Sequence, residues 1–290
     1  GVDPSRTPAG TPTAKRASPA RRVYIPRMRI VSLCPSLTEL VFDLGRGDDL
    51  VGVTKFCIHP AEGVASIEKV GGTKNPRVER IAELAPDIVL LNEEENRIED
   101  AEALQGRGIS CHVSFPRTAA ETATMVRSIG AAIGAVPEAE RIAVEIEAGV
   151  RRVHDRAVGR EAVRFAYLIW RDPVMAAGTD TFISDLLGLA GGVNVFDASS
   201  GFNDRYPTVG IEGLAAANPD VVLLSTEPFP FQGRHADELS AATGIPRQTF
   251  RIVDGEMLSW HGSRTPRGID YAGSLIEAIR SSEDTNHDDR

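Results

Sequence analysis

VERIAELAPDIVLLNEE at residues 78–94 recurs 133 positions later as IEGLAAANPDVVLLSTE at residues 211–227. Each copy combines a short helical segment, a Pro-Asp turn and an apolar run with the length of a buried strand. Eight aligned positions are identical: Glu79/Glu212, Ala82/Ala215, Pro86/Pro219, Asp87/Asp220, Val89/Val222, Leu90/Leu223, Leu91/Leu224 and Glu94/Glu227. This duplication predicts two similar α/β lobes, and ligands commonly bind where two such units meet.

Composition limits the classes of protein that the chain can represent. Its 290 residues fit two domains of ~100–150 residues each. No apolar run approaches the ~18 residues that span a bilayer, so we expect no membrane span. The net charge of −9 repels phosphate backbones, and we therefore expect no nucleic-acid partner.

Both ends of the chain are polar and poor in residues that build a core. Residues 1–28 contain no apolar stretch of the ~7–15 residues found in a secretory signal, and we predict a disordered leader. The remainder of a cleaved signal and a start site assigned ahead of Met28 are both consistent with this segment. Residues 282–290 are predicted to form a disordered tail.

Residues 29–136 alternate between apolar runs typical of strands and amphipathic segments typical of helices. The first run, RIVSLC, leads into Pro35 and Ser36, and Ser36 has the capping-box spacing to Glu39. Residues 159–281 show the same alternation after the run RFAYLIW. This order predicts two mainly parallel central sheets, each covered by helices.

Residues 137–158 join the two predicted lobes. Their apolar positions follow one helical stripe: Ala139, Ile142, Ile146, Val150, Val153 and Ala157. Pro137 near the start and Gly159 beyond the end are typical of helix boundaries. About 20 helical residues extend ~30 Å, so we predict one long, rigid connecting helix rather than a flexible tether.

Six motifs, in this order, resemble the helical-backbone metal-chelate receptors, a family of substrate-binding proteins of ABC importers. They are RIVSLCPSLTELVFDLG, LVGVT, VERIAELAPDIVLLN, AAGTDTFISDLLGLAGGVNVF, YPTVGIEGLAAANPDVVLLS and SWHGSRTPRGIDYAG. Within that family the periplasmic cobalamin-binding type is the nearest. The resemblance implies a receptor, not an enzyme, that has no intrinsic cofactor and binds a corrinoid or ferric siderophore between rigid lobes. It also implies a periplasmic or extracytoplasmic location and delivery to the membrane subunits of an ABC importer, and we expect a monomer.

The resemblance also assigns roles to individual residues. Glu79 and Glu212, which are paired in the duplicated stretch, correspond to glutamates that dock on the transporter. The residues that clamp the ligand with aromatic rings correspond to Phe56, Thr73, Met175 and Tyr206. Two of these four side chains are not aromatic, which favours a smaller or differently shaped ligand.

Three residues in predicted loops carry groups that bind metals. Cys57 and His59 follow a predicted strand, and a thiolate with an imidazole can ligate a transition metal. His261, beside Trp260 in a loop of the other lobe, is a third candidate donor across the cleft. Hydrogen bonding at the surface is the alternative role for each histidine.

Other candidate ligand contacts lie at predicted strand ends and before the last predicted helix. Trp170 and Arg171 end a strand, where α/β proteins place ligands, and they offer a stacking face and a donor for carboxylates. Arg264 suits an anionic or amide-bearing ligand, whereas Glu94 suits a cationic group or a hard metal. Each has a structural alternative. Arg171 could lie in a surface turn, Arg264 could flank the last predicted helix, and Glu94 could belong to a solvated acidic face.

Two other functions are compatible with these residues. One is a cytosolic enzyme or intracellular binder of the same fold that uses the Cys57/His59 loop. The chain contains no G-x-S-x-G, Walker, G-x-G-x-x-G or H-E-x-x-H motif, which argues against catalysis. The other is a receptor for a metal ion, ligated by His59, His261 and carboxylates such as Glu94.

Overall fold

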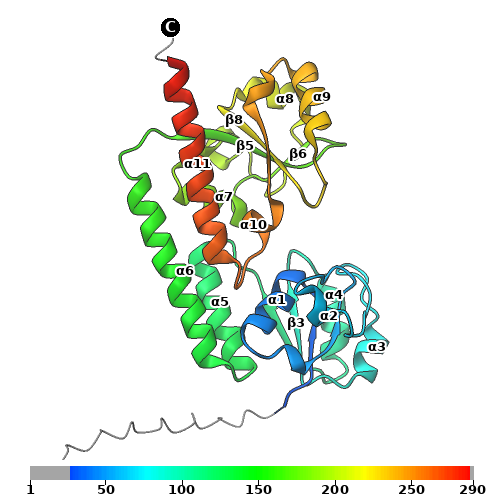
Figure 1. Cartoon of the computed structure of the whole chain (residues 1–290). Helices are drawn as coiled ribbons and strands as arrows, with labels where there is room; N and C mark the ends of the chain where they lie inside the picture. Colours follow the sequence, from blue (N-terminus) through cyan, green and yellow to red (C-terminus); the bar gives the residue numbers. More distant parts are fainter. Residues whose placement is uncertain (1–26, 288–290) are drawn as a thin grey trace, which may run out of the picture.

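The computed structural model describes residues 27–287 and contains two lobes, each built around a β-sheet (Figure 1). The sheet of the N-terminal lobe has four parallel strands in the order β2-β1-β3-β4. These strands are β1 (Ile30–Ser32), β2 (Leu50–Val53), β3 (Ile88–Asn92) and β4 (Cys111–Ser114). The helical elements of this lobe are α1 (Pro35–Asp43), η1 (Gly47–Asp49), α2 (Ala61–Val64), α3 (Val78–Glu83) and α4 (Ile98–Gln105).

The sheet of the C-terminal lobe is centred on its longest strand, β5. On one side, β5 pairs with β8, and β8 pairs with β9. On the other side, β7 pairs with the first half of β5, and the antiparallel β6 pairs with the second half of β5. The strands are β5 (Val163–Trp170), β6 (Met175–Ala176), β7 (Gly192–Asn194), β8 (Val221–Ser225) and β9 (Phe250–Val253). The helical elements are α7 (Phe182–Leu189), η2 (Ala198–Ser200), α8 (Gly210–Ala217), α9 (Gly233–Thr243), η3 (Arg247–Thr249) and α10 (Gly255–Ser259). Both sheets are mainly parallel, which confirms the predicted α/β fold class.

Three long helices lie side by side along one flank of the molecule and join the lobes (Figure 1). They are α5 (Ala119–Ala132), α6 (Val136–Ala157) and α11 (Thr265–His287). Helix α6 has 22 residues and corresponds to the predicted connecting helix. A β-carbon at Gly130 of α5 would lie 2.2 Å from the β-carbon of Ala139, so the close packing of α5 on α6 requires glycine there.

The duplicated stretch folds into α3 and β3 in one lobe and into α8 and β8 in the other. Asp87 of the first copy accepts a hydrogen bond from the backbone N–H of Arg29 at 2.8 Å. Asp220 of the second copy accepts one from the N–H of Arg164 at 2.7 Å. The two arginine side chains also make equivalent bonds, to the carbonyls of Leu84 and Ala217 at the ends of α3 and α8. The Pro-Asp turn therefore fastens each repeated helix to the first strand of its own lobe.

The structure corrects two predictions about helix ends. Helix α1 begins at Pro35 with Cys34 as its N-cap residue, so Ser36 lies inside the helix and forms no capping box. Helix α11 continues to His287, so the predicted tail was wrong for residues 282–287. The predicted leader, apart from its last two residues, lies outside the part of the chain that the structure describes. Between residues 27 and 287 no helix is long and apolar enough to cross a bilayer.

Candidate functional site

The carboxyl ends of the parallel strands in each lobe face the other lobe. In the N-terminal lobe, Ser36, His59 and Asn92 follow or end β1, β2 and β3, and each side chain contacts a residue of the C-terminal lobe. In the C-terminal lobe, Glu256 follows β9 and contacts His59. Because the carboxyl ends of parallel strands share one edge of a sheet, the two edges oppose each other, and α/β proteins place ligands at such edges. We call this region the interlobe junction.

A buried ion-pair cluster holds the interlobe junction together. The Arg264 side chain is 8% exposed, and its guanidinium donates to both carboxylate oxygens of Glu39 at 2.8 and 2.9 Å. It also donates to Glu256, whose carboxylate lies 3.2 Å from the Nε2 atom of His59. The guanidinium carbon lies 4.6 Å from the ring centroid of Trp260, and that ring contacts His59 edge to face. The cluster thus joins Glu39 and His59 of the N-terminal lobe to Glu256, Trp260 and Arg264 of the C-terminal lobe.

His261 lies deeper in the interlobe junction, with 6% of its surface exposed. The side-chain amide of Asn92 donates to Nε2 at 3.0 Å, and Nδ1 lies 3.4 Å from the hydroxyl of Ser36. Burial lowers the pKa of His261 to about 4, because an imidazolium ion would lose its hydration there. The ring is therefore neutral at pH 7, and both of its nitrogens already have hydrogen-bond partners.

Glu94 forms a second contact between the lobes. Its carboxylate accepts hydrogen bonds from Arg205, at 2.6 Å, and from the hydroxyl of Tyr206. The guanidinium of Arg205 also lies over the ring of Phe115, 4.5 Å from the centroid. Burial and the charge of Glu94 raise the pKa of Tyr206, so its hydroxyl remains a donor. Glu94 therefore connects the lobes in this structure.

Apolar side chains are exposed on both facing edges. Phe56 and Ile58, in the loop after β2, are 51% and 52% exposed. Trp170, at the carboxyl end of β5, is 41% exposed and contacts the ring of Phe229 edge to face at 5.7 Å. Exposed aromatic rings at such an edge are suited to stack on a flat ligand.

The interlobe junction also contains a group of carboxylates. Burial raises the pKa of Glu227 and of Glu95, and each is raised further by a neighbouring carboxylate. The charges that act on Glu227 include those of Glu256 and Glu95, which places the three carboxylates in one electrostatic environment across the junction. Such a surface favours ligands that donate hydrogen bonds and disfavours ligands with several free carboxylates.

The predicted metal donors do not converge. The Cys57 thiol lies 3.1 Å from the hydroxyls of Thr38 and Thr54, and burial raises its pKa, so it is a buried, neutral side chain. His59, in contrast, contacts the other lobe. Among residues 27–287, no group of three or more His, Cys, Asp or Glu side chains is arranged to hold a metal ion.

The remaining predicted ligand contacts occupy different places. Arg171 pairs with Glu238 of α9 at 2.7 Å, within the C-terminal lobe. Thr73 is buried, and its carbonyl accepts a hydrogen bond from Asn96. Met175 is half-buried in β6, the neighbour of the strand that ends at Trp170.

Several residues of the interlobe junction were not predicted as site residues: Glu39, Glu95, Arg205, Glu227, Phe229 and Glu256. Asn92 was also missed, although it ends a strand of the duplicated stretch and such ends commonly face a ligand. The same position in the second copy, Ser225, hydrogen-bonds to Tyr167 inside the C-terminal lobe. Strand ends in the duplicated stretch were a sequence signal for Asn92 and Glu227, but not for the other residues.

The two glutamates that the resemblance assigned to transporter docking are exposed at the starts of α3 and α8. Glu79 accepts a hydrogen bond from Arg107 at 2.9 Å. Glu212 makes no hydrogen bond or ion pair with any residue in the described part of the chain. The two carboxylates thus occupy equivalent positions in the two lobes, but only that of Glu79 is already engaged by another side chain.

The comparisons with known proteins agree with this arrangement. Residues 30–244 match the family model described as periplasmic binding protein. Since this match covers more than half of the chain, the chain belongs to that family. The family and the related proteins are binding proteins of ABC transporters, which confirms the prediction of a substrate-binding protein and overturns the enzyme alternative.

Individual relatives extend over most of the chain. A vitamin B12-binding protein of Vibrio campbellii is 24% identical over 255 residues, which cover 88% of this chain and 91% of that protein. An uncharacterised ABC transporter substrate-binding lipoprotein of Bacillus subtilis, YvrC, is 28% identical over 260 residues, or 87% of this chain and 79% of the lipoprotein.

Solved structures share the fold. The periplasmic vitamin B12 binding protein BtuF of Vibrio cholerae superposes with a TM-score of 0.75 at 21% identity, over 88% of this chain and 98% of BtuF. The apo form of the periplasmic haem-binding protein RhuT from Roseiflexus sp. RS-1 gives a TM-score of 0.74 at 23% identity, over 88% and 99% of the two chains.

Removal of the Arg264 guanidinium tests the ion-pair cluster. We expect Arg264→Ala to lower the free energy of unfolding by about 3–5 kcal/mol, because Glu39 would be left as a buried charge without its main partner. Arg267→Ala is the matched control, since Arg267 is 61% exposed and only 3.7 Å from Glu39. Chemical denaturation of both variants measures the difference. Equal stability of the two variants would contradict this role for Arg264.

The pH dependence of stability tests the burial of His261. Below pH 6.5 the unfolded chain binds a proton at His261 that the folded protein binds only near pH 4. The contribution of the neutral ring to the free energy of unfolding is therefore complete above pH 6.5 and is lost as the pH falls toward 4. The stability difference between wild type and His261→Gln should shrink by about 3 kcal/mol over this range. Denaturation curves from pH 4 to 8 measure it, and a constant difference would refute the assignment.

Proposed function

We propose that the chain is the substrate-binding protein of an ABC importer and that it binds a metal chelate of the corrinoid type between its lobes. The observation that carries this proposal is the pair of exposed aromatic residues on the facing edges, Phe56 and Trp170. A broad ligand with apolar faces can contact both, and the tetrapyrrole-like plane of a corrinoid has this shape.

The charges of the interlobe junction favour an amide-bearing chelate over a carboxylate-bearing one. Glu95, Glu227 and Glu256 lie in this region, and Arg264 is already engaged with Glu39 and Glu256. Carboxylates accept hydrogen bonds from amide N–H groups and repel propionate-type side chains. The names of the Vibrio relatives refer to vitamin B12, which is an amide-bearing corrinoid. A ferric siderophore without free carboxylates satisfies the same requirements.

The proposed site comprises the exposed rings and the half-buried residues near them. We assign stacking to Phe56, Trp170 and Phe229, and the flanking contacts to Tyr206 and Met175. His261 and Cys57 are not assigned to the ligand because both are buried within the protein. The ion-pair cluster keeps the lobes at a fixed separation, so binding needs no large closing motion.

The proposal includes an extracytoplasmic location and a complex with the membrane subunits of the importer. Relatives carry names of periplasmic proteins or of a substrate-binding lipoprotein. Glu79 and Glu212 are the proposed docking residues, since duplicated helices present them at equivalent positions of the two lobes. A transporter built from two equivalent membrane subunits can bind both.

Cyanocobalamin binding tests the proposed ligand class. We expect saturable binding by isothermal titration calorimetry and about tenfold weaker affinity for Phe56→Ala and for Trp170→Ala, because each loses one stacking contact. Val144→Ala is the control, since Val144 is 47% exposed on the connecting helix α6, away from the facing sheet edges. Haemin and a neutral ferric siderophore, titrated in parallel, define the preference. Absence of binding to all three chelates would refute the proposal.

Association with the importer tests the docking residues. Glu79→Ala and Glu212→Ala should each weaken binding to the reconstituted membrane subunits, by about tenfold or more. Glu212→Ala should have the larger effect, because Glu79 must break its hydrogen bond with Arg107 before it can bind the importer. Biolayer interferometry on nanodiscs measures both, with the partly exposed Glu138→Ala of α6 as control. Wild-type affinity in both docking variants would exclude these two residues.

A further inference from the structure

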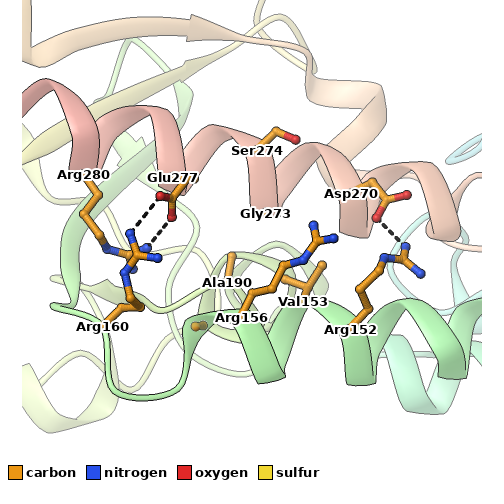
Figure 2. Close-up of a pocket in the computed structure, with 11 residues that line it drawn as sticks. Arg152, Val153, Arg156, Arg160, Ala190, Asp270, Gly273, Ser274, Glu277 and Arg280 are labelled. Atoms are coloured by element: carbon orange, nitrogen blue, oxygen red, sulfur yellow. Dashed lines mark hydrogen bonds and ion pairs between the residues drawn. The ribbon is translucent and has the colours of Figure 1, made fainter.

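A groove of about 600 Å³ lies between α6 and α11 (Figure 2). Its walls are formed by the last turns of α6, the residues just after it, and the facing side of α11. None of the residues that line it belongs to the interlobe junction. The ionisable residues of its lining are Arg152, Arg156, Arg160, Asp270, Glu277 and Arg280.

The groove carries an excess of positive charge in a chain whose net charge is −9. Arg152 is neutralised by Asp270, with 2.5 Å between donor and acceptor. Arg160 and Arg280 share the single carboxylate of Glu277, at 2.8 and 3.0 Å. Two carboxylates therefore serve four guanidinium groups.

Two arginines of the groove have guanidinium N–H groups without a protein partner among residues 27–287, and Arg156 is the first. It makes no hydrogen bond or ion pair with any residue in the described part of the chain. Figure 2 shows its side chain between the two helices, pointing toward Gly273. Arg152 and Arg156 lie four residues apart on α6, a spacing at which like charges repel along a helix face, and Arg160 follows just after the helix ends.

Arg280 is the second arginine with a guanidinium N–H group that has no partner among the described residues. It is 7% exposed, and its Nη2 atom is buried without a hydrogen-bond partner. Its Nε atom donates to the carbonyl of Glu161 at 2.9 Å, which fixes the guanidinium at the end of the groove where Arg160 also points (Figure 2). A buried donor without a partner is costly. Because Nη2 is closed to solvent and lies against Gly191, an anion in the groove would compensate the charge of the guanidinium group rather than bond to this atom.

Basic residues near the carboxyl end of a helix also interact favourably with the helix dipole. That effect explains Arg156 in the last turn of α6. It does not explain Arg280, which α11 contributes from the opposite wall, or its unpaired Nη2 atom.

We propose that this groove binds a small oxyanion of the phosphate class with at least two negative charges. The anion contacts Arg156 and the Arg160–Arg280 pair, and guanidinium groups form paired hydrogen bonds with phosphate oxygens. The site is independent of the metal-chelate site, because the long helices separate the groove from the facing sheet edges (Figure 1).

Pyrophosphate binding to the full chain is the direct test. We expect a saturable rise in Tm with pyrophosphate and a smaller one with inorganic phosphate, since ligands that bind only the folded state stabilise it. Arg156→Gln and Arg160→Gln should each lower the pyrophosphate affinity at least fivefold. Arg151→Gln is the matched control: Arg151 is exposed on the same helix but does not line the groove. Arg151→Gln should bind like wild type.

Three results would overturn the proposal: no saturable binding at millimolar pyrophosphate, wild-type affinity in Arg156→Gln, or an equal loss in Arg151→Gln. Vesicles of phosphatidylglycerol, compared with phosphatidylcholine, identify the source of the phosphate group. Binding to the anionic vesicles that depends on Arg156 assigns a lipid headgroup, whereas pyrophosphate binding without vesicle binding assigns a free anion. Cyanocobalamin titration of Arg156→Gln should match wild type, which separates this site from the proposed function.

Discussion

The contact between Arg264 and its two carboxylate partners, Glu39 and Glu256, determines how the lobes face each other. A buried guanidinium is stable only when its donors are paired. Glu39 comes from α1 of the N-terminal lobe, whereas Arg264 and Glu256 come from the C-terminal lobe. Separation of the lobes would expose or unpair these charges together. The geometry of every other residue at the interlobe junction therefore depends on this cluster.

The cluster also explains why the exposed aromatic residues remain available. Trp260 is covered by Arg264 and His59, whereas Phe56 and Trp170 are left outside. A rigid junction with exposed rings is preorganised, and preorganisation reduces the entropy cost of binding. The long helices α5, α6 and α11 support the same rigidity from the flank of the molecule.

Much of the architecture was predictable because its signals are local or repeated. The apolar stripe from Ala139 to Ala157 predicted the connecting helix, and the Pro-Asp turns predicted the duplicated lobe. Their physical basis is the bond from each turn's aspartate, Asp87 or Asp220, to the first strand of its lobe. A contact that holds a strand in place in both lobes leaves the same residues in both copies.

The site was less predictable because its contacts join distant residues. Glu39 and Arg264 are 225 positions apart, and the local pattern around Glu39 indicated a capping box instead. The imidazole side chain of His261 suggested a contact with the ligand. Its burial between Ser36 and Asn92 gives it a structural role instead. Phe56 was predicted from the family resemblance and Trp170 from its place at a strand end, and neither prediction required knowledge of a partner residue.

We propose that the facing sheet edges form a fixed site for a metal chelate. A crystal structure of the protein with cyanocobalamin, in which anomalous scattering locates the cobalt ion, would test this proposal. We expect one cobalt position between Phe56 and Trp170, with the Arg264–Glu39 contacts retained. Cobalt bound elsewhere on the molecule, or a broken Arg264–Glu39 pair in the complex, would contradict it.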